Sequence, residues 1–252
     1  MDGKEHLALA LDTPRLDVAE DLVRRTRDVV GVYKVGLQMF TTYGPKAVER
    51  IKSLDVEVFL DLKLHDIPNT VASAVTAAQS LGVDYLTLHA LGGKRMMEAA
   101  KAAADEGHVG GKKLQLLAVS ILTHHAANEL PTIGLSNNPD DEVKRLVTLA
   151  HDSGVDGCVC SPEEAAQVRA EQGDDFFIVT PGIRPAGTAA GDQSRIATPD
   201  EAIAAGANLL VVGRPIRTAP DPAEAARAIV EAIAAAKAGT ASDVSDDEKA
   251  DA

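Results

Sequence analysis

The feature that most constrains the fold is a regular alternation of short apolar runs with longer segments of helical periodicity. Eight runs have the length and β-branched content of strands; they are 6–12, 32–36, 56–63, 83–90, 114–122, 156–161, 176–183 and 207–216. The segments between them, such as 45–54 and 140–154, repeat apolar residues at helical spacing. Each predicted strand is therefore followed by a predicted helix.

This order predicts an α/β fold, a single (β/α)8 barrel of the TIM type. The strand runs are almost continuously apolar, which is typical of a parallel sheet covered by helices. A doubly wound open sheet is the structural alternative. The sequence contains neither G-x-G-x-x-G nor G-x-x-x-x-G-K-[ST], so no nucleotide-binding fingerprint favours the open sheet.

The chain of 252 residues has the length of one barrel domain. We expect the barrel to occupy residues 1–238 and a disordered acidic tail to occupy 239–252, because GTASDVSDDEKADA has almost no bulky apolar side chain to bury. No stretch of the sequence is long and apolar enough for a signal or membrane segment, so we expect a cytoplasmic protein that binds no membrane.

The formal net charge is −13, which argues against a general affinity for nucleic acid and requires any phosphate site to be local. The acidity fits a high-salt cytoplasm as well as an ordinary one. The two cysteines, Cys158 and Cys160, are separated by one residue within a predicted strand. That spacing builds neither a disulfide framework nor a zinc site, so we predict buried thiols.

Charged residues close several of the predicted strands, and in such barrels the chemistry lies at the carboxyl ends of the strands. Asp61 and Lys63 are two apart on one strand, so their side chains should share a face. Together with Lys34 and Asp66 they would form an array of alternating charge, and Asp12 closes the first strand. A purely structural ion-pair network is the alternative.

The last two predicted strands lead into TPGIRP and VVGRPI, with GDQSR in the loop between them. Loops after strands 7 and 8 of these barrels often bind phosphate. The candidates are Arg184, Gln193, Gly213 and Arg214, and the alternative for the two arginines is a surface position. The histidines, among them His124 and His125, lack metal-binding spacing, so we expect no metal and place this pair in a solvated loop.

Read together, LALALD, VYKVG, FLDLKLHDIPNT, LTLHALGG, VSILT, VTPGIRP, GDQSR and VVGRPI resemble the ordered motifs of the orotidine 5'-phosphate decarboxylase family, in its bacterial-type branch. The resemblance covers nearly everything before the tail, and D-L-K-x-H-D-I-P-N-T is its most specific part. The loop after Thr123, with its two histidines, has no counterpart that we can match to a role.

The resemblance implies decarboxylation of orotidine 5'-phosphate to UMP in de novo pyrimidine biosynthesis, without metal or organic cofactor. It implies a homodimer in which Asp66 and Thr70 reach the neighbouring subunit's site. The implied catalytic residues are Lys34, Asp61, Lys63 and Asp66, with Lys63 as the proton donor. The implied substrate-binding residues are Asp12 and Lys34 for the ribose, Ser120 and Thr123 for the base, and Arg184, Gln193, Gly213 and Arg214 for the phosphate.

Three alternatives remain open at this point. Magnesium-dependent sugar-phosphate decarboxylases and hexulose-phosphate synthases of the same superfamily also carry D-x-K-x-x-D. Lys63 could instead be the Schiff-base lysine of an aldolase. A barrel that binds a phosphorylated ligand without turnover is the third reading.

Overall fold

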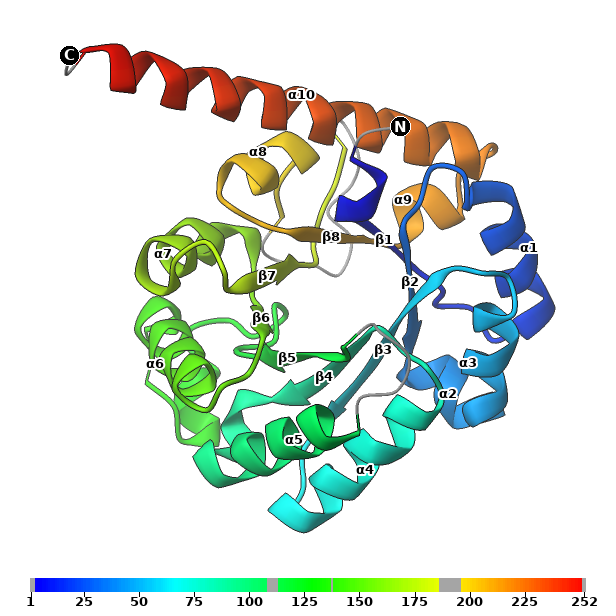
Figure 1. The fold of residues 1–252 in the computed structure, drawn as a ribbon, viewed down its shortest axis with the longest axis vertical. Coiled ribbons are helices and arrows are strands. Elements are labelled where there is room, and N and C mark those ends of the chain that lie inside the picture. The colour runs from blue at the N-terminus through cyan, green and yellow to red at the C-terminus, as the bar shows by residue number, and fades with distance from the viewer. Residues whose placement is uncertain (1–2, 108–112, 137, 186–195, 251–252) are drawn as a thin grey trace.

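Eight parallel strands close into a barrel in chain order, with β8 paired to β1 (Figure 1). The computed structural model describes residues 3–107, 113–136, 138–185 and 196–250, and for 240–250 only the backbone. The strands are β1 (Leu7–Ala10), β2 (Val32–Gly36), β3 (Glu57–Leu64), β4 (Tyr85–His89), β5 (Gln115–Val119), β6 (Gly157–Val159), β7 (Phe177–Thr180) and β8 (Leu209–Val212). The predicted barrel is confirmed, and the open sheet was the wrong alternative.

Helices surround the barrel on its outside (Figure 1). They are α1 (Leu16–Thr26), α2 (Leu37–Tyr43), α3 (Pro45–Lys52), α4 (Pro68–Ser80), α5 (Lys94–Glu106), α6 (Pro139–Asp152), α7 (Pro162–Gln172), α8 (Pro199–Ala204), α9 (Arg214–Arg217) and α10 (Pro222–Ala250). Proline is the first residue of six of them, where the missing N–H costs nothing and the fixed φ suits the helix. Capping boxes at Ser161 and Thr198 fix the starts of α7 and α8.

Helix α10 begins against the barrel and continues past it, through most of the segment for which the composition predicts a tail (Figure 1). It packs on α8, α1 and α9. The boundary at 238 and the disorder of 239–252 stay predictions. Among the described residues, no helix combines the length and the apolar character that crossing a membrane requires.

Two apolar layers result from the alternation of side chains along the strands. In β1, Leu7 and Leu9 face the helices, whereas Ala8 and Ala10 face the barrel interior. The large side chains of the interior come from β3, β4 and β7: Tyr85 lies edge-on to Phe59, with ring centroids 6.0 Å apart, and stacks on Phe177 at 5.6 Å. These aromatic rings occupy interior space that the alanines of β1 leave open.

The amino end of the barrel carries a hydrogen-bonding arrangement that recurs three times. An Asp or Asn just before an even-numbered strand accepts the backbone N–H of a residue in the preceding strand; the pairs are Asp84 with Val58 (2.8 Å), Asp156 with Leu116 (2.9 Å) and Asn208 with Ile178 (2.8 Å). Each side chain also accepts from a cation on a helix, namely Lys52, Lys101 and Arg169 respectively. These clamps tie helices to strands at the end opposite the charged strand termini.

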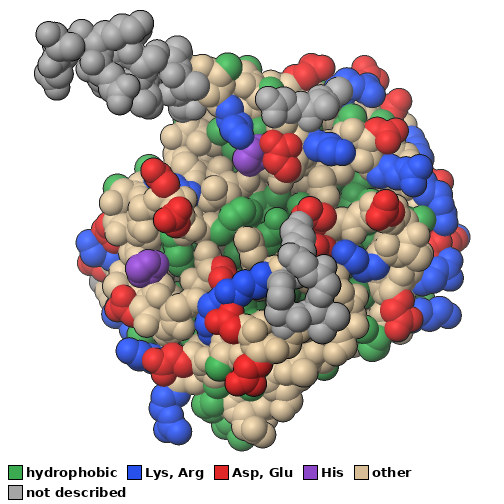
Figure 2. Space-filling model, in the orientation of Figure 1, with side chains coloured by type: hydrophobic (Ala, Val, Ile, Leu, Met, Phe, Trp, Pro, Cys, Tyr) green, Lys and Arg blue, Asp and Glu red, His purple; other side chains and the backbone are tan. Residues whose placement is uncertain are grey.

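Both cysteines are free and buried, as predicted. On the face that Figure 2 shows, Lys and Arg side chains alternate with Asp and Glu side chains over the outer surface. His124 is exposed and His125 half-buried in the irregular segment after β5, which confirms the predicted loop.

Candidate active site

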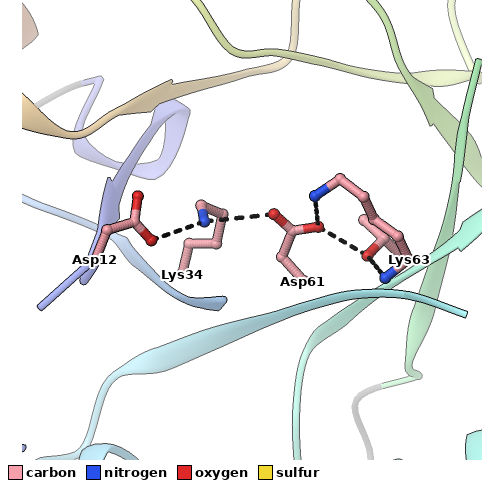
Figure 3. A network of polar contacts seen from close by, with 5 residues as sticks. Asp12, Lys34, Asp61 and Lys63 are labelled. Carbon is pink, nitrogen blue, oxygen red and sulfur yellow. Dashed lines mark hydrogen bonds and ion pairs between the residues drawn. The ribbon is translucent and has the colours of Figure 1, made fainter. Parts of the chain in front are cut away.

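Four charged side chains, three in the neighbouring strands β2 and β3 and one just after β1, form one chain of alternating sign at the carboxyl end of the barrel (Figure 3). The ammonium of Lys34, in β2, lies 3.4 Å from Asp12 Oδ1 and 3.3 Å from Asp61 Oδ2. Asp61 Oδ1 in turn lies 2.8 Å from Lys63 Nζ. Lys34 and Asp61 face the interior because they stand two residues after the inward-facing Val32 and Phe59. Asp12 follows β1 at the rim.

The mutual contacts keep this chain of charges ionised. Burial by itself would raise the pKa of the Asp61 carboxyl, but the charges of Lys34 and Lys63 and the hydrogen bonds from Lys63 and Thr87 outweigh it and hold this pKa below its usual range. Burial would likewise lower the pKa of Lys34, yet the carboxylates of Asp61 and Asp12 raise it. Both shifts favour the charged form at neutral pH.

The backbone at Lys63 departs from a regular strand. The pairing of β3 with β4 shifts between Leu60 and Leu64, and Lys63 has a φ of 51°, in the left-handed region that a residue with a side chain rarely adopts. Its N–H donates to Thr87 Oγ1 at 2.9 Å. The sequence pattern predicts a regular strand here; Asp61 and Lys63 do meet, but through a bulge that Thr87 holds.

Thr87, in β4, connects both partners of this pair. Its side chain is fully buried, and its hydroxyl donates to Asp61 Oδ1 at 2.9 Å while it accepts the amide of Lys63. One hydroxyl thus fixes the carboxylate and the backbone of the lysine. In the sequence Thr87 is one residue of a mostly apolar strand run, so nothing there indicates this role.

The charged chain lines one part of a cavity of about 450 Å³. Phe59, Val159 and Val211 contribute an apolar floor, and segments after β5, β6, β7 and β8 complete the wall. Arginines from the last two of these segments lie in the same wall: Arg184, Arg214 and Arg217. The cavity therefore joins a charge-balanced region to a cationic one across an apolar floor.

Most of the predicted site residues lie in this wall; they are Asp12, Lys34, Asp61, Lys63, Thr123, Arg184, Gly213 and Arg214. Ser120 is buried beside it, with its hydroxyl donating to the carbonyl of Val159 at 3.1 Å, and does not line it. Gln193 lies outside the described residues.

Asp66 and Thr70 do not line the cavity of their own chain. Asp66 is exposed and accepts the N–H of Ile67 at 2.6 Å, while Thr70 is exposed in the first turn of α4. Within one chain Asp12 takes the fourth place of the alternating array, and the role of Asp66 stays a prediction. Asp66 lies outside the cavity because the backbone turns outward into α4 after the bulge.

His89, one of the histidines that lack metal-binding spacing, ends β4 and does not line the cavity. Burial lowers the pKa of its imidazole, and the neighbouring side chains of His65 and Lys63 lower it further, so His89 is neutral near pH 7. Its ring lies 5.7 Å from that of His65. The described residues contain no group of three or more His, Cys, Asp or Glu side chains that could hold a metal ion.

Known proteins match this chain over almost its whole length. The model of the orotidine 5'-phosphate decarboxylase / HUMPS family matches residues 5–229. The orotidine 5'-phosphate decarboxylase of Halorhodospira halophila is 52% identical over 93% of this chain and 98% of its own, and that of Anaeromyxobacter sp. strain K is 48% identical over 92% and 100%.

Solved structures agree with this assignment. The crystal structure of orotidine 5'-phosphate decarboxylase from Lactobacillus acidophilus superposes with a TM-score of 0.80 at 35% identity, covering 91% of this chain and 99% of that one. The match in sequence, in barrel topology and in the ordered strand-end motifs leads to one conclusion: this chain belongs to the orotidine 5'-phosphate decarboxylase / HUMPS family.

Proposed function

We propose that this protein decarboxylates orotidine 5'-phosphate to UMP, a step of pyrimidine biosynthesis; its relatives are named orotidine 5'-phosphate decarboxylases. The observation that carries the proposal is the contact between Lys63 and Asp61 at 2.8 Å, in the wall of a cavity whose other end is cationic. The cavity thus offers a paired ammonium and carboxylate to one end of a ligand and arginines to the other.

The reaction requires the bond from C6 to the carboxylate carbon to break, with its electron pair left on C6. The pyrimidine ring does not delocalise that pair as an enolate would, so stabilisation must be electrostatic. The ammonium of Lys63 is the group suited to stabilise the developing charge. It then donates its proton to C6, which gives UMP, CO₂ and a neutral lysine that solvent reprotonates.

Asp61 has two roles in this scheme. Its lowered pKa keeps it anionic beside the substrate carboxylate, which disfavours the ground state, and its hydrogen bond from Lys63 orients the ammonium. We give the stabilisation by Lys63 the larger weight, because interactions stronger in the transition state than in the ground state raise kcat.

The remaining wall residues suit the non-reacting parts of a nucleotide. Asp12 and Lys34 are assigned to the ribose hydroxyls, Thr123 and the backbone near Ser120 to the base, and Arg184, Gly213 and Arg214 to the phosphate. A Cβ added to Gly213 would meet only the side chain of Ala10, at 3.5 Å, so packing within the protein does not demand glycine there. A glycine facing the cavity leaves the backbone accessible to a phosphate.

We further propose that the protein acts as a homodimer, with Asp66 and Thr70 reaching the partner's cavity. Support comes from three large hydrophobic side chains that are exposed just after consecutive strands: Leu37 (55% exposed) after β2, Ile67 (67%) after β3 and Leu91 (39%) after β4. These strands are neighbours in the barrel, so the three residues, called the apolar rim, lie at the same end of it as the charged site. Covering that rim with a second copy would remove apolar surface from water.

The test is the loss of orotidine 5'-phosphate absorbance with purified protein, in EDTA, at low and at high salt. Lys63→Ala should abolish turnover and leave UMP binding measurable, since proton donation follows binding. Lys144→Ala removes an exposed lysine on α6, 53% exposed in its side chain, and serves as the matched control. EDTA-sensitive turnover, trapping of Lys63 by borohydride, or binding without turnover would each replace the proposal by the corresponding alternative.

A further inference from the structure

Arg217 is a cavity residue that the family motifs do not single out. It ends α9, and its backbone N–H donates to the carbonyl of Gly213 at 2.9 Å. Because it stands three residues after Arg214, both side chains lie on one side of the helical turn. Both also line the cavity, together with Arg184 from the segment after β7.

One hydrogen-bond donor in the side chain of Arg217 lacks an acceptor among the described residues. This donor is the Nε, and it is buried. A buried donor without an acceptor is destabilising, and such groups in native proteins usually serve a ligand or an ordered solvent molecule. The guanidinium fork matches the oxygen atoms of a phosphate and can bind two of them at once.

The charges of the cavity wall support an anionic ligand. Among the described residues five cations line it, namely Lys34, Lys63, Arg184, Arg214 and Arg217, against the two carboxylates of Asp12 and Asp61. The described part of this wall therefore has a formal charge of +3, in a protein of net charge −13. Orotidine 5'-phosphate carries a carboxylate and a phosphate that is mostly dianionic at neutral pH. Without Arg217 the described part of the wall would carry a formal charge of +2, less than the total charge of about −3 on this ligand.

We propose that Arg217 is a third arginine of the phosphate-binding end and contacts the phosphate oxygens through its guanidinium. The proposal rests on the function given above for the identity of the nucleotide, but the anion contact itself does not depend on turnover. It predicts a phosphate-specific contribution to affinity, whereas a purely structural arginine would affect every ligand equally.

The experiment compares Arg217→Ala, Arg217→Lys and the control Arg227→Ala, which removes an exposed arginine of α10. Calorimetry measures their affinities for UMP, uridine and inorganic phosphate. Arg217→Ala should weaken the binding of UMP and of inorganic phosphate about 10-fold, because one charge-assisted hydrogen bond is lost. The affinity for uridine should stay unchanged. Arg217→Lys should fall between the wild type and Arg217→Ala, and Arg227→Ala should match the wild type.

Unchanged affinity of Arg217→Ala for phosphate and UMP would overturn the proposal, as would an equal loss for UMP and uridine. A phosphate-specific loss supports it even in a protein that shows no decarboxylation, so failure of the proposed function and failure of this inference are distinguishable. The kinetic counterpart is a fall in kcat/KM for orotidine 5'-phosphate in Arg217→Ala that is absent with orotidine, its nucleoside.

Discussion

Replacing Thr87 with valine removes one hydroxyl and nearly preserves the volume of the side chain, so it isolates the hydrogen bonds that hold Asp61 and Lys63. The hydroxyl donates to the Asp61 carboxylate at 2.9 Å and accepts the Lys63 amide at 2.9 Å. A hydrogen bond to a charged group contributes about 1.5–3 kcal/mol, and a donor left without its acceptor costs about 1–3 kcal/mol. We expect the free energy of unfolding to fall by about 3 kcal/mol.

The same change should reduce activity through the position of Lys63. The left-handed backbone at Lys63, with φ of 51°, needs an external contact to persist, and the valine side chain offers no acceptor. A loss of about 1.5–3 kcal/mol in transition-state stabilisation corresponds to a fall in kcat of about 10- to 100-fold. Affinity for UMP should change little, since Thr87 does not line the cavity.

Two assays and one control variant test this reasoning. Urea denaturation gives the free energy of unfolding, and the absorbance of orotidine 5'-phosphate gives kcat and KM. Thr87→Ser keeps the hydroxyl and loses one methyl group, so it should cost only about 1 kcal/mol of stability and retain most of kcat. Wild-type kcat in a folded Thr87→Val protein would refute the positioning role.

Three further predictions concern stability, pH and assembly. Asp156→Ala removes the acceptor of the Leu116 N–H and the partner of Lys101 and should cost about 2–4 kcal/mol in urea denaturation, whereas the exposed control Asp174→Ala should cost little; equal losses would contradict the clamp. Burial would raise the pKa of Asp61, but Lys34 and Lys63 outweigh it, so the pKa of this carboxyl is lowered in the folded protein. The ionised carboxylate therefore contributes its full stabilisation above about pH 4, the ordinary pKa of aspartate. That contribution is lost as the pH falls below this value. The stability difference between wild type and Asp61→Asn should therefore shrink in acid, and a difference independent of pH would argue against the shift. Ile67→Glu places a charge in the apolar rim and should dissociate the proposed dimer in sedimentation and make activity depend on protein concentration. A variant that stays dimeric would contradict an interface at this rim.

The sequence alone was sufficient for the barrel, because each strand and helix follows from short-range patterns of apolar residues that repeat eight times. It also predicted which strand ends carry charge, since the carboxyl ends of parallel strands share one rim. The strand-end pattern accordingly indicates Asp12, Lys34, Asp61, Lys63, Arg184 and Arg214, and these residues line one cavity.

Tertiary structure decided how those charges are held and which further residues join them. The bulge at Lys63 depends on Thr87 in the next strand, 24 residues later, and pairing between strands has no local signal in the sequence. The position of Asp66, outside the cavity of its own chain, depends on the start of α4. Arg217 joins Arg184 only because the ends of β7 and β8 are adjacent in the closed barrel. Local patterns specify the elements, whereas contacts between residues distant in the chain are fixed only when the barrel closes.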